Sequence, residues 1–215
     1  MNVELIALTR YLRDNGTPVA LLEHAGRICY QSEGRGEPGK FVRARVEEGH
    51  ESIIEHASAT FEISGISRAC SHQLVRHRLA SYSQESQRYV DMAEPDWVLP
   101  LDVLESEEAM AVWIDFADKV KGAYRALREL GVRKEDARFV LPNAAATQII
   151  VTMNFRELLH FFRIRISGPA QWEIREVGVR MLELIYPHAP SVFGPFREKM
   201  MEERPEFFEG IEEAE

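Results

Sequence analysis

The alternation of apolar and polar side chains predicts a small number of strands. Residues 3–8 form a short apolar run, and residues 57–64 alternate between apolar and polar positions with the period of two that is typical of a half-buried strand. Residues 147–153 are rich in β-branched and apolar side chains. We therefore expect a strand at each of these three places.

Helical spacing is more widespread in the chain. The clearest case is residues 105–130, where one apolar stripe recurs every three or four residues and Gly131 follows at a position that suits a helix end. Asn154 and Glu157 have the spacing of a helix N-cap, whereas Pro187 and Pro190 are expected to end regular structure. The other helices are expected at residues 19–29, 40–48, 66–75, 133–141, 154–168 and 169–186, with a glycine-rich loop at residues 34–39.

These elements predict an α+β fold, because helices outnumber strands and do not alternate strictly with them. No repeat or linker separates two domains. We expect one domain over residues 1–197, followed by an acidic tail over residues 198–215, which holds eight glutamates against Lys199 and Arg204.

Composition indicates a cytoplasmic protein. The 215 residues are 45% hydrophobic and 28% charged, which suffices for a core. The two cysteines, Cys29 and Cys70, show no spacing typical of disulfide scaffolds. We find neither a signal peptide nor an apolar stretch long enough to span a membrane, so no membrane association is expected.

The net charge of −9 is unevenly distributed. The tail accounts for −6 of it and the rest of the chain for −3. Residues 63–84 and 137–156 contain no Asp or Glu but several arginines. Guanidinium groups match phosphate and carboxylate oxygens two at a time, so these stretches indicate an anionic ligand. The alternative is that the arginines are solvated or paired with carboxylates.

Residues 76–89 are the most informative segment. Three arginines, one histidine, three serines, two glutamines and two tyrosines lie within fourteen residues. The segment is too polar for a core strand and lacks a helical stripe, so we expect a loop that binds a polyanionic heterocycle through many hydrogen-bond donors.

This segment resembles the signature of the flavin-dependent thymidylate synthases. That signature is Arg-His-Arg, then seven residues, then Ser, and Arg two residues further on, which matches residues 76–78, Ser86 and Arg88. The resemblance departs from the commonest form at residues 83–84, where Ser-Gln replaces Asn-Glu. Further matching blocks are residues 49–52, 55–56, 137–138, 154–156, 165 and 170–174.

The resemblance implies reductive methylation of dUMP to dTMP, with methylenetetrahydrofolate as carbon donor, FAD as redox carrier and NADPH as reductant. It also implies an α+β fold with an antiparallel sheet flanked by helices, and a homotetramer whose active sites combine several subunits. The small-molecule partners are then dUMP and folate, and no nucleic acid is expected.

The resemblance also assigns residues. Arg165 corresponds to the arginine that activates the uracil; it cannot act as a base, but it can stabilise negative charge on the ring. The positions that correspond to flavin contacts are Ser52, Arg76, His77, Arg78, Gln84, Asn154, Phe155, Arg156 and His160. The positions that correspond to dUMP contacts are Gln73, Leu74, Val75, Arg76, Gln84, Glu85, Ser86, Gln87, Arg88, Arg138 and Arg165.

Some residues have two interpretations. For Ser86 we favour a hydrogen bond to dUMP over nucleophilic attack, since no general base stands near it in the sequence. Cys70 is a candidate nucleophile, but a buried small hydrophobic residue is the favoured interpretation. Either His50 or His77 is expected at the flavin ring. The histidine spacings match no metal motif, so no metal is expected.

Two other function classes remain open at this point. One is a small nucleic-acid-binding protein that stacks Tyr82 and Tyr89 on bases, which the acidic net charge disfavours. The other is a flavoprotein oxidase that binds a nucleotide without methyl transfer.

Overall fold

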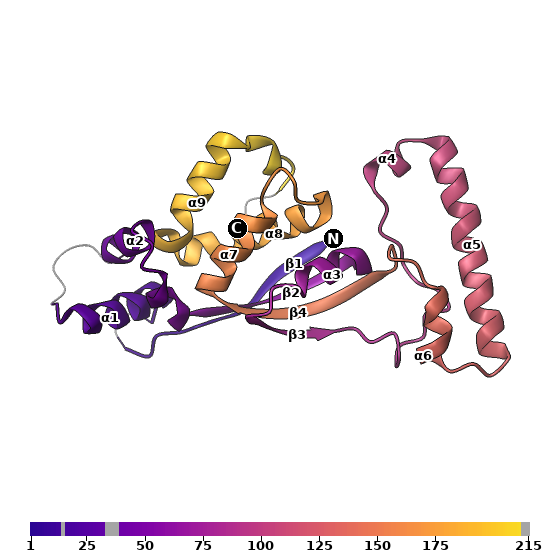
Figure 1. Cartoon of the computed structure of the whole chain (residues 1–215), viewed down its shortest axis with the longest axis horizontal. Coiled ribbons are helices and arrows are strands. Elements are labelled where there is room, and N and C mark those ends of the chain that lie inside the picture. The colour runs from indigo at the N-terminus through magenta and orange to yellow at the C-terminus, as the bar shows by residue number, and fades with distance from the viewer. Residues whose placement is uncertain (14–15, 33–38, 212–215) are drawn as a thin grey trace. The chain divides into compact units, whose positions relative to one another are not determined.

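A computed structural model describes residues 1–13, 16–32 and 39–211. Within them, strands β1 (Asn2–Leu8), β2 (Ser58–Ser67), β3 (Ala80–Gln84) and β4 (Ala146–Asn154) form one antiparallel sheet in the order β1-β2-β4-β3 (Figure 1). The predicted α+β fold with an antiparallel sheet is confirmed. The predicted loop at residues 34–39 lies outside the described residues, except for Gly39.

The chain forms two compact units. The first contains Met1, Ser64–Gln73 and Ser83–Ile149, and the second contains Asn2–Ile63, Leu74–Tyr82 and Ile150–Glu215. Strands β2, β3 and β4 each contribute residues to both units. The units are described separately below.

The first unit is built around the longest described helix. Its helices are α3 (Arg68–Leu74), α4 (Leu101–Leu104), α5 (Glu107–Glu129), α6 (Lys134–Ala137) and the 3₁₀ turn η2 (Arg138–Val140). The predicted helix at residues 105–130 is confirmed. Ser106 caps α5 by accepting a hydrogen bond from Ala109 N at 3.2 Å, and Gly131 follows its end with φ of +85°. Tyr124 of α5 is fully buried in a small core with Met92 and Ala137.

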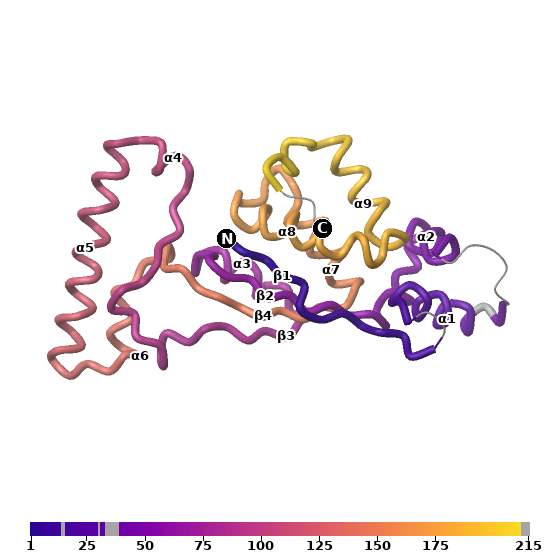
Figure 2. The backbone as a smooth tube through the Cα atoms, turned by 180° about the vertical axis from the view of Figure 1, so that it is seen from behind, coloured from indigo at the N-terminus to yellow at the C-terminus, as the bar shows by residue number. Residues whose placement is uncertain are grey.

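The second unit packs helices onto the sheet. Its helices are α1 (Pro18–Tyr30), α2 (Lys40–Glu47), η1 (Glu51–His56), α7 (Phe155–Arg165), α8 (Trp172–Ile185), η3 (Tyr186–His188), α9 (Pro190–Glu203) and η4 (Pro205–Phe207). Figure 2 shows α7 and α8 beside β1, and α8 contacts β1 directly. Fully buried aromatic rings of α7 and α9, including Phe155, Phe162 and Phe193, make edge contacts at 5.1–5.7 Å. This core fixes α7, which carries several predicted site residues.

The capping prediction at the start of α7 is confirmed. Asn154 Oδ1 accepts a hydrogen bond from Glu157 N at 2.9 Å. Because β4 ends at Asn154 and α7 begins at Phe155, this cap turns the chain from the sheet into the helix within one residue.

Three sequence predictions are wrong. Residues 80–84 are not a loop but strand β3; its position at the edge of the sheet leaves alternate side chains exposed, so a polar sequence is tolerated. The helix expected from Pro169 begins at Trp172, because Gln171 is its N-cap. Pro190 does not end regular structure but begins α9, as proline suits the first helical turn.

The expected boundary between residues 197 and 198 falls inside a helix. Helix α9 runs to Glu203, and Glu198 pairs with Arg43 of α2 at 2.9 Å. The first part of the acidic tail therefore belongs to the folded second unit. Among the described residues, no helix combines the length and apolar character needed to span a membrane.

Candidate active site

A buried histidine connects two residues of α7. Arg165 donates a hydrogen bond from Nε to His77 Nε2 at 3.0 Å, and His77 Nδ1 lies 3.3 Å from Glu157 Oε1. His77 stands in the turn between α3 and β3, whereas Glu157 and Arg165 lie two helical turns apart on α7. All three residues belong to the second unit.

These contacts determine the protonation of His77. Arginine has only donors, so Nε2 must carry a lone pair and the ring proton must reside on Nδ1. Burial, with Arg165 and His160 nearby, lowers the pKa of His77 to about 4. The ring is therefore neutral near pH 7, and a carboxylate oxygen of Glu157 lies 3.3 Å from the nitrogen that carries its proton. Burial raises the pKa of Glu157, an effect that His160 opposes.

The His77 ring is enclosed on several sides. It packs edge-on against Phe161, with ring centroids 4.9 Å apart, and near His160 at 5.9 Å. The single O–H group of Tyr82 is shared between the main-chain carbonyls of Leu74 and His77, which both lie 2.8 Å from its oxygen. Burial and the Glu157 charge raise the pKa of Tyr82, which keeps this donor protonated. Only 5% of His77 is exposed.

A cavity of about 670 Å³ adjoins α7. It is lined by predicted flavin residues Asn154, Arg156 and His160, together with Glu157 and Leu79. Arg156 forms an ion pair with Glu55 at this cavity, and Arg163 pairs with Glu51 at 2.6 Å. The cavity wall thus carries cations that are already partly balanced by carboxylates.

Arg76 and Arg78 precede Leu79 of the cavity and are both exposed. In the part of the chain that the structure describes, neither has a carboxylate within ion-pair distance. Two exposed guanidiniums close in sequence to a cavity-lining residue suit a pyrophosphate, so the residues present fit a dinucleotide such as FAD.

Other predicted flavin and substrate residues differ in exposure. Ser52 is exposed on η1, and His50 is exposed just before it. Phe155 and Leu74 are fully buried in the core, so only their main-chain atoms remain for a ligand contact. Val75 is 37% exposed.

In the first unit, Gln84 is anchored by two hydroxyls. Its Nε2 donates to Ser71 Oγ at 2.9 Å and to Thr147 Oγ1 at 3.2 Å. A glutamate here would have to accept from these hydroxyls, whereas the amide donates to them. The neighbouring Glu85 accepts from Gln148 Nε2 at 3.1 Å.

The segment after β3 turns back on itself. Ser86 Oγ accepts from Arg88 N at 3.3 Å, and the Ser86 carbonyl accepts from Tyr89 N and Val90 N. Gln87 is buried at 9% exposure, and Gln73 lies on α3. The Ser86 hydroxyl thus lies within a local turn.

Glu135 holds two of the predicted substrate arginines. Arg88 Nε lies 2.5 Å from Glu135 Oε2, and Arg138 Nε donates to the Glu135 carbonyl at 3.1 Å. Burial lowers the pKa of Arg68, and the like charge of Arg138 adds to this effect. The guanidiniums of Arg88 and Arg138, both held by Glu135, form a candidate anion site within the first unit.

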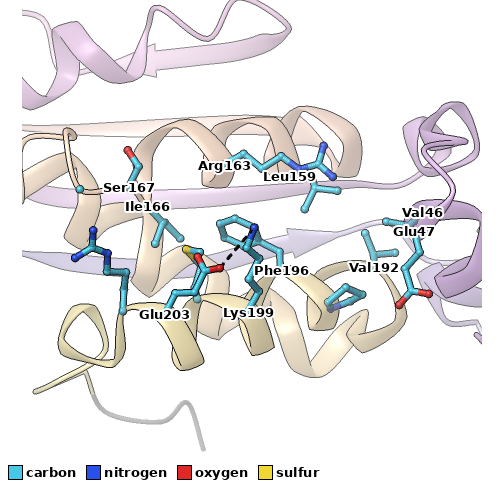
Figure 3. A pocket seen from close by; sticks show the side chains of 14 residues that line it. Val46, Glu47, Leu159, Arg163, Ile166, Ser167, Val192, Phe196, Lys199 and Glu203 are labelled. Atoms are coloured by element: carbon cyan, nitrogen blue, oxygen red, sulfur yellow. Dashed lines mark ion pairs between the residues drawn. The ribbon is translucent and has the colours of Figure 1, made fainter.

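Two further cavities lie elsewhere. One of about 550 Å³ lies among α2, α7 and α9, with Leu159, Phe196 and the ion pair of Lys199 with Glu203 (3.8 Å) in its wall (Figure 3). None of the predicted site residues, all of which the structure describes, lines it. The other, of about 630 Å³, belongs to the first unit and includes Glu85, Thr147 and Gln148.

Sequence reasoning missed three residues of these clusters. The sequence indicates Glu157 only as part of a helix cap, although its carboxylate lies against His77. For Tyr82 the sequence suggests only base stacking, whereas its hydroxyl contacts the main chain of the turn at His77. No sequence pattern indicates Glu135, because its contact with Arg88 forms only when the fold brings α6 to the segment after β3.

Comparison with known proteins gives consistent matches. The family model described as thymidylate synthase complementing protein matches residues 10–191. A flavin-dependent thymidylate synthase of Geobacter sulfurreducens is 49% identical over 199 residues, covering 87% of this chain and 84% of that protein. That of Nitratidesulfovibrio vulgaris is 44% identical over 213 residues, covering 89% and 84%. That of Pyrococcus furiosus is 43% identical over 190 residues, covering 85% and 78%.

Proposed function

The chain belongs to the thymidylate synthase complementing protein family, and from this premise we propose how its residues perform the reaction. The protein is a flavin-dependent thymidylate synthase that converts dUMP to dTMP, with methylenetetrahydrofolate as carbon donor and NADPH as reductant. The observation that carries the residue assignment is the contact of Arg165 with the buried, neutral ring of His77.

FAD, when bound, supplies the hydride chemistry of the reaction. We assign its pyrophosphate to Arg76 and Arg78, which the described residues leave without carboxylate partners. Asn154, Arg156 and His160 line the cavity next to α7. These three residues and Ser52 are assigned to the rest of the cofactor. Main-chain atoms of His77 and Phe155 complete the proposed flavin contacts, and Gln84 is proposed to contact both flavin and substrate.

The dUMP site is proposed on two groups of residues. Arg88 and Arg138 are assigned to the phosphate, since both are guanidiniums held in place by Glu135. Gln73, residues 74–76 and residues 84–87 are proposed to contact the nucleotide. Arg165 is proposed to act on the uracil, where its fixed positive charge stabilises the negative charge that develops on the ring.

A homotetramer with composite active sites is part of the proposal. Exposed apolar residues on α5, such as Val112 at 72% and Ile114 at 51%, support a further protein surface covering this helix. We also propose a cytoplasmic location, which suits the thiol state of Cys29 and Cys70 in the structure.

The function is tested with purified protein. The preparation is expected to be yellow, to release FAD on denaturation and to consume NADPH when dUMP and methylenetetrahydrofolate are present. A colourless protein that takes up no added FAD and consumes no NADPH would exclude the enzyme, and would leave the nucleic-acid-binding alternative.

The residue roles are tested with two variants and one control. Arg165→Ala is expected to lower dTMP formation at least about 100-fold while FAD stays bound, because a preorganised charge at the reacting ring is lost. Arg78→Ala is expected instead to weaken flavin retention. Arg180→Ala, which removes only the pair with Glu176 at 2.9 Å on α8, should leave both properties unchanged. Normal turnover in Arg165→Ala would reject its assignment.

A further inference from the structure

We propose that Glu157 is a positioning residue, which acts through His77 to orient the guanidinium of Arg165 toward the substrate ring. This inference deepens the proposed function and rests on its assignment of Arg165 to the uracil. The helix cap uses only the main-chain N–H of Glu157 and does not require its carboxylate. The proposal therefore gives this carboxylate a role of its own.

The first step is the direction of the hydrogen bonds. Arg165 can only donate, so His77 must present an unprotonated Nε2. A neutral imidazole carries its one proton on either nitrogen, and the other tautomer would point an N–H at the Arg165 N–H. In this proposal Glu157, 3.3 Å from Nδ1, accepts a hydrogen bond from the Nδ1–H group on the far side and so selects the tautomer that Arg165 needs.

The second step is the enclosure of the ring. Phe161 and His160 pack around His77, and Tyr82 fixes its main-chain carbonyl. With 5% exposure and both nitrogens engaged, the ring has no further hydrogen-bonding atom for a ligand. His77 therefore contributes to the site through Arg165 and through its main chain.

The third step is the charge around the group. Among the described residues, Arg165 and His160 act electrostatically on His77, and the carboxylate of Glu157 lies 3.3 Å from its Nδ1. A negative carboxylate behind the ring raises its basicity at Nε2, which strengthens the bond to the arginine. The same three-part arrangement, in which a carboxylate orients a histidine, fixes tautomers in metal sites and catalytic triads.

The test uses two substitutions at one position. Glu157→Leu removes the acceptor at nearly constant volume and is expected to lower kcat about 10- to 100-fold, because a misplaced charged group near the reacting atoms costs rate of this order. The KM for dUMP and the FAD content should change less than about twofold. Glu157→Gln retains an acceptor oxygen and should restore kcat to within a few-fold of the wild type. Glu176→Leu is the matched control, because Glu176 is a half-buried glutamate of α8 that pairs with Arg180 and is assigned to no ligand.

A double-mutant cycle keeps the proposal testable if Glu157→Leu folds poorly. If Glu157 acts through His77, then Glu157→Gln with His77→Gln should lose no more activity than His77→Gln alone. Full additivity of the two losses, or a kcat of Glu157→Leu equal to that of the wild type, would overturn the positioning role. Absence of dTMP formation by the wild type would instead refute the proposed function.

Discussion

The neutral state of His77 illustrates how single residues are tuned in this fold. Burial removes the water that stabilises an imidazolium, and Arg165 and His160 add unfavourable positive charge, so the pKa of His77 falls to about 4. A histidine in the unfolded chain has a pKa of about 6.5. Below that pH the unfolded chain takes up a proton that folded His77 does not.

We therefore expect His77 to make the protein less stable in acid. The neutral ring makes its full contribution to the free energy of unfolding above pH 6.5. This contribution is lost as the pH falls toward 4, and the free energy of unfolding then decreases by roughly 1–3 kcal/mol. Urea unfolding measured at several pH values should show this decrease. The difference in the free energy of unfolding between the wild type and His77→Gln should become smaller over the same pH range. A constant difference would contradict the lowered pKa of His77.

Cys70 is a second residue whose environment decides its role. Its side chain is fully buried on α3, and its N–H donates to Ser67 Oγ at 3.0 Å. Burial confirms the interpretation as a small core residue rather than an accessible nucleophile.

Cys70→Ala is accordingly expected to retain dTMP formation within about twofold. The free energy of unfolding should fall by about 1 kcal/mol, because one buried sulfur atom is removed. Cys29→Ala, at an exposed position, is the control and should change neither property. Loss of turnover in folded Cys70→Ala would reinstate it as a nucleophile.

At the scale of elements, the sequence predicts what local patterns encode. The stripe of α5, the Asn154 cap and the alternation in β2 all reappear in the structure, because each depends on residues close in sequence. Strand β3 was missed because only its place at the sheet edge explains a polar strand. The Glu135 and Glu157 contacts were missed because they join segments that are distant in sequence.

Helix packing provides a further prediction from two glycines. A Cβ atom on Gly26 of α1 would lie 2.5 Å from the Phe41 ring of α2, whereas a Cβ on Gly122 of α5 meets no described atom within 4 Å. Phe41 is also held by Arg27 and Arg45, whose guanidiniums lie 4.8 and 5.5 Å from its ring centre. The ring therefore has limited room to move away.

Gly26→Ala is expected to destabilise the protein by about 1–3 kcal/mol, through overpacking between α1 and α2. The same substitution at Gly122 should stabilise it by about 0.5–1 kcal/mol, because alanine favours a helix interior. Chemical unfolding of both variants measures these changes in the free energy of unfolding. Equal changes in the two variants would show that the contact with Phe41 does not determine the effect of Gly26→Ala.

At the scale of the whole molecule, the distribution of charge matters more than its total. The net charge of −9 is concentrated in the C-terminal glutamates, while the acid-free stretches carry Arg76, Arg78 and Arg138, three of the four arginines assigned to phosphate groups. Part of that acidic segment is structural, since Glu198 pairs with Arg43. An acidic protein can thus bind anionic nucleotides at local sites.

Assembly is predicted at the same scale. Light scattering of the purified protein should give a mass four times the 24.7 kDa of one chain. Val112→Asp, at an exposed apolar position of α5, should shift the protein toward smaller species, because a carboxylate is costly to bury in an interface. A monomer in the wild type would contradict the composite active site.

The central claim is that this protein transfers a one-carbon unit to dUMP and reduces it. The methylene group of the folate becomes a methyl group, which requires two electrons, and NADPH supplies two. The most direct measurement is the amount of dTMP formed against NADPH consumed under anaerobic conditions, with dUMP and methylenetetrahydrofolate in excess. Our account predicts equal amounts of the two. Absence of dTMP under these conditions, with NADPH consumption that begins only when oxygen is admitted, would contradict it and identify a flavoprotein oxidase.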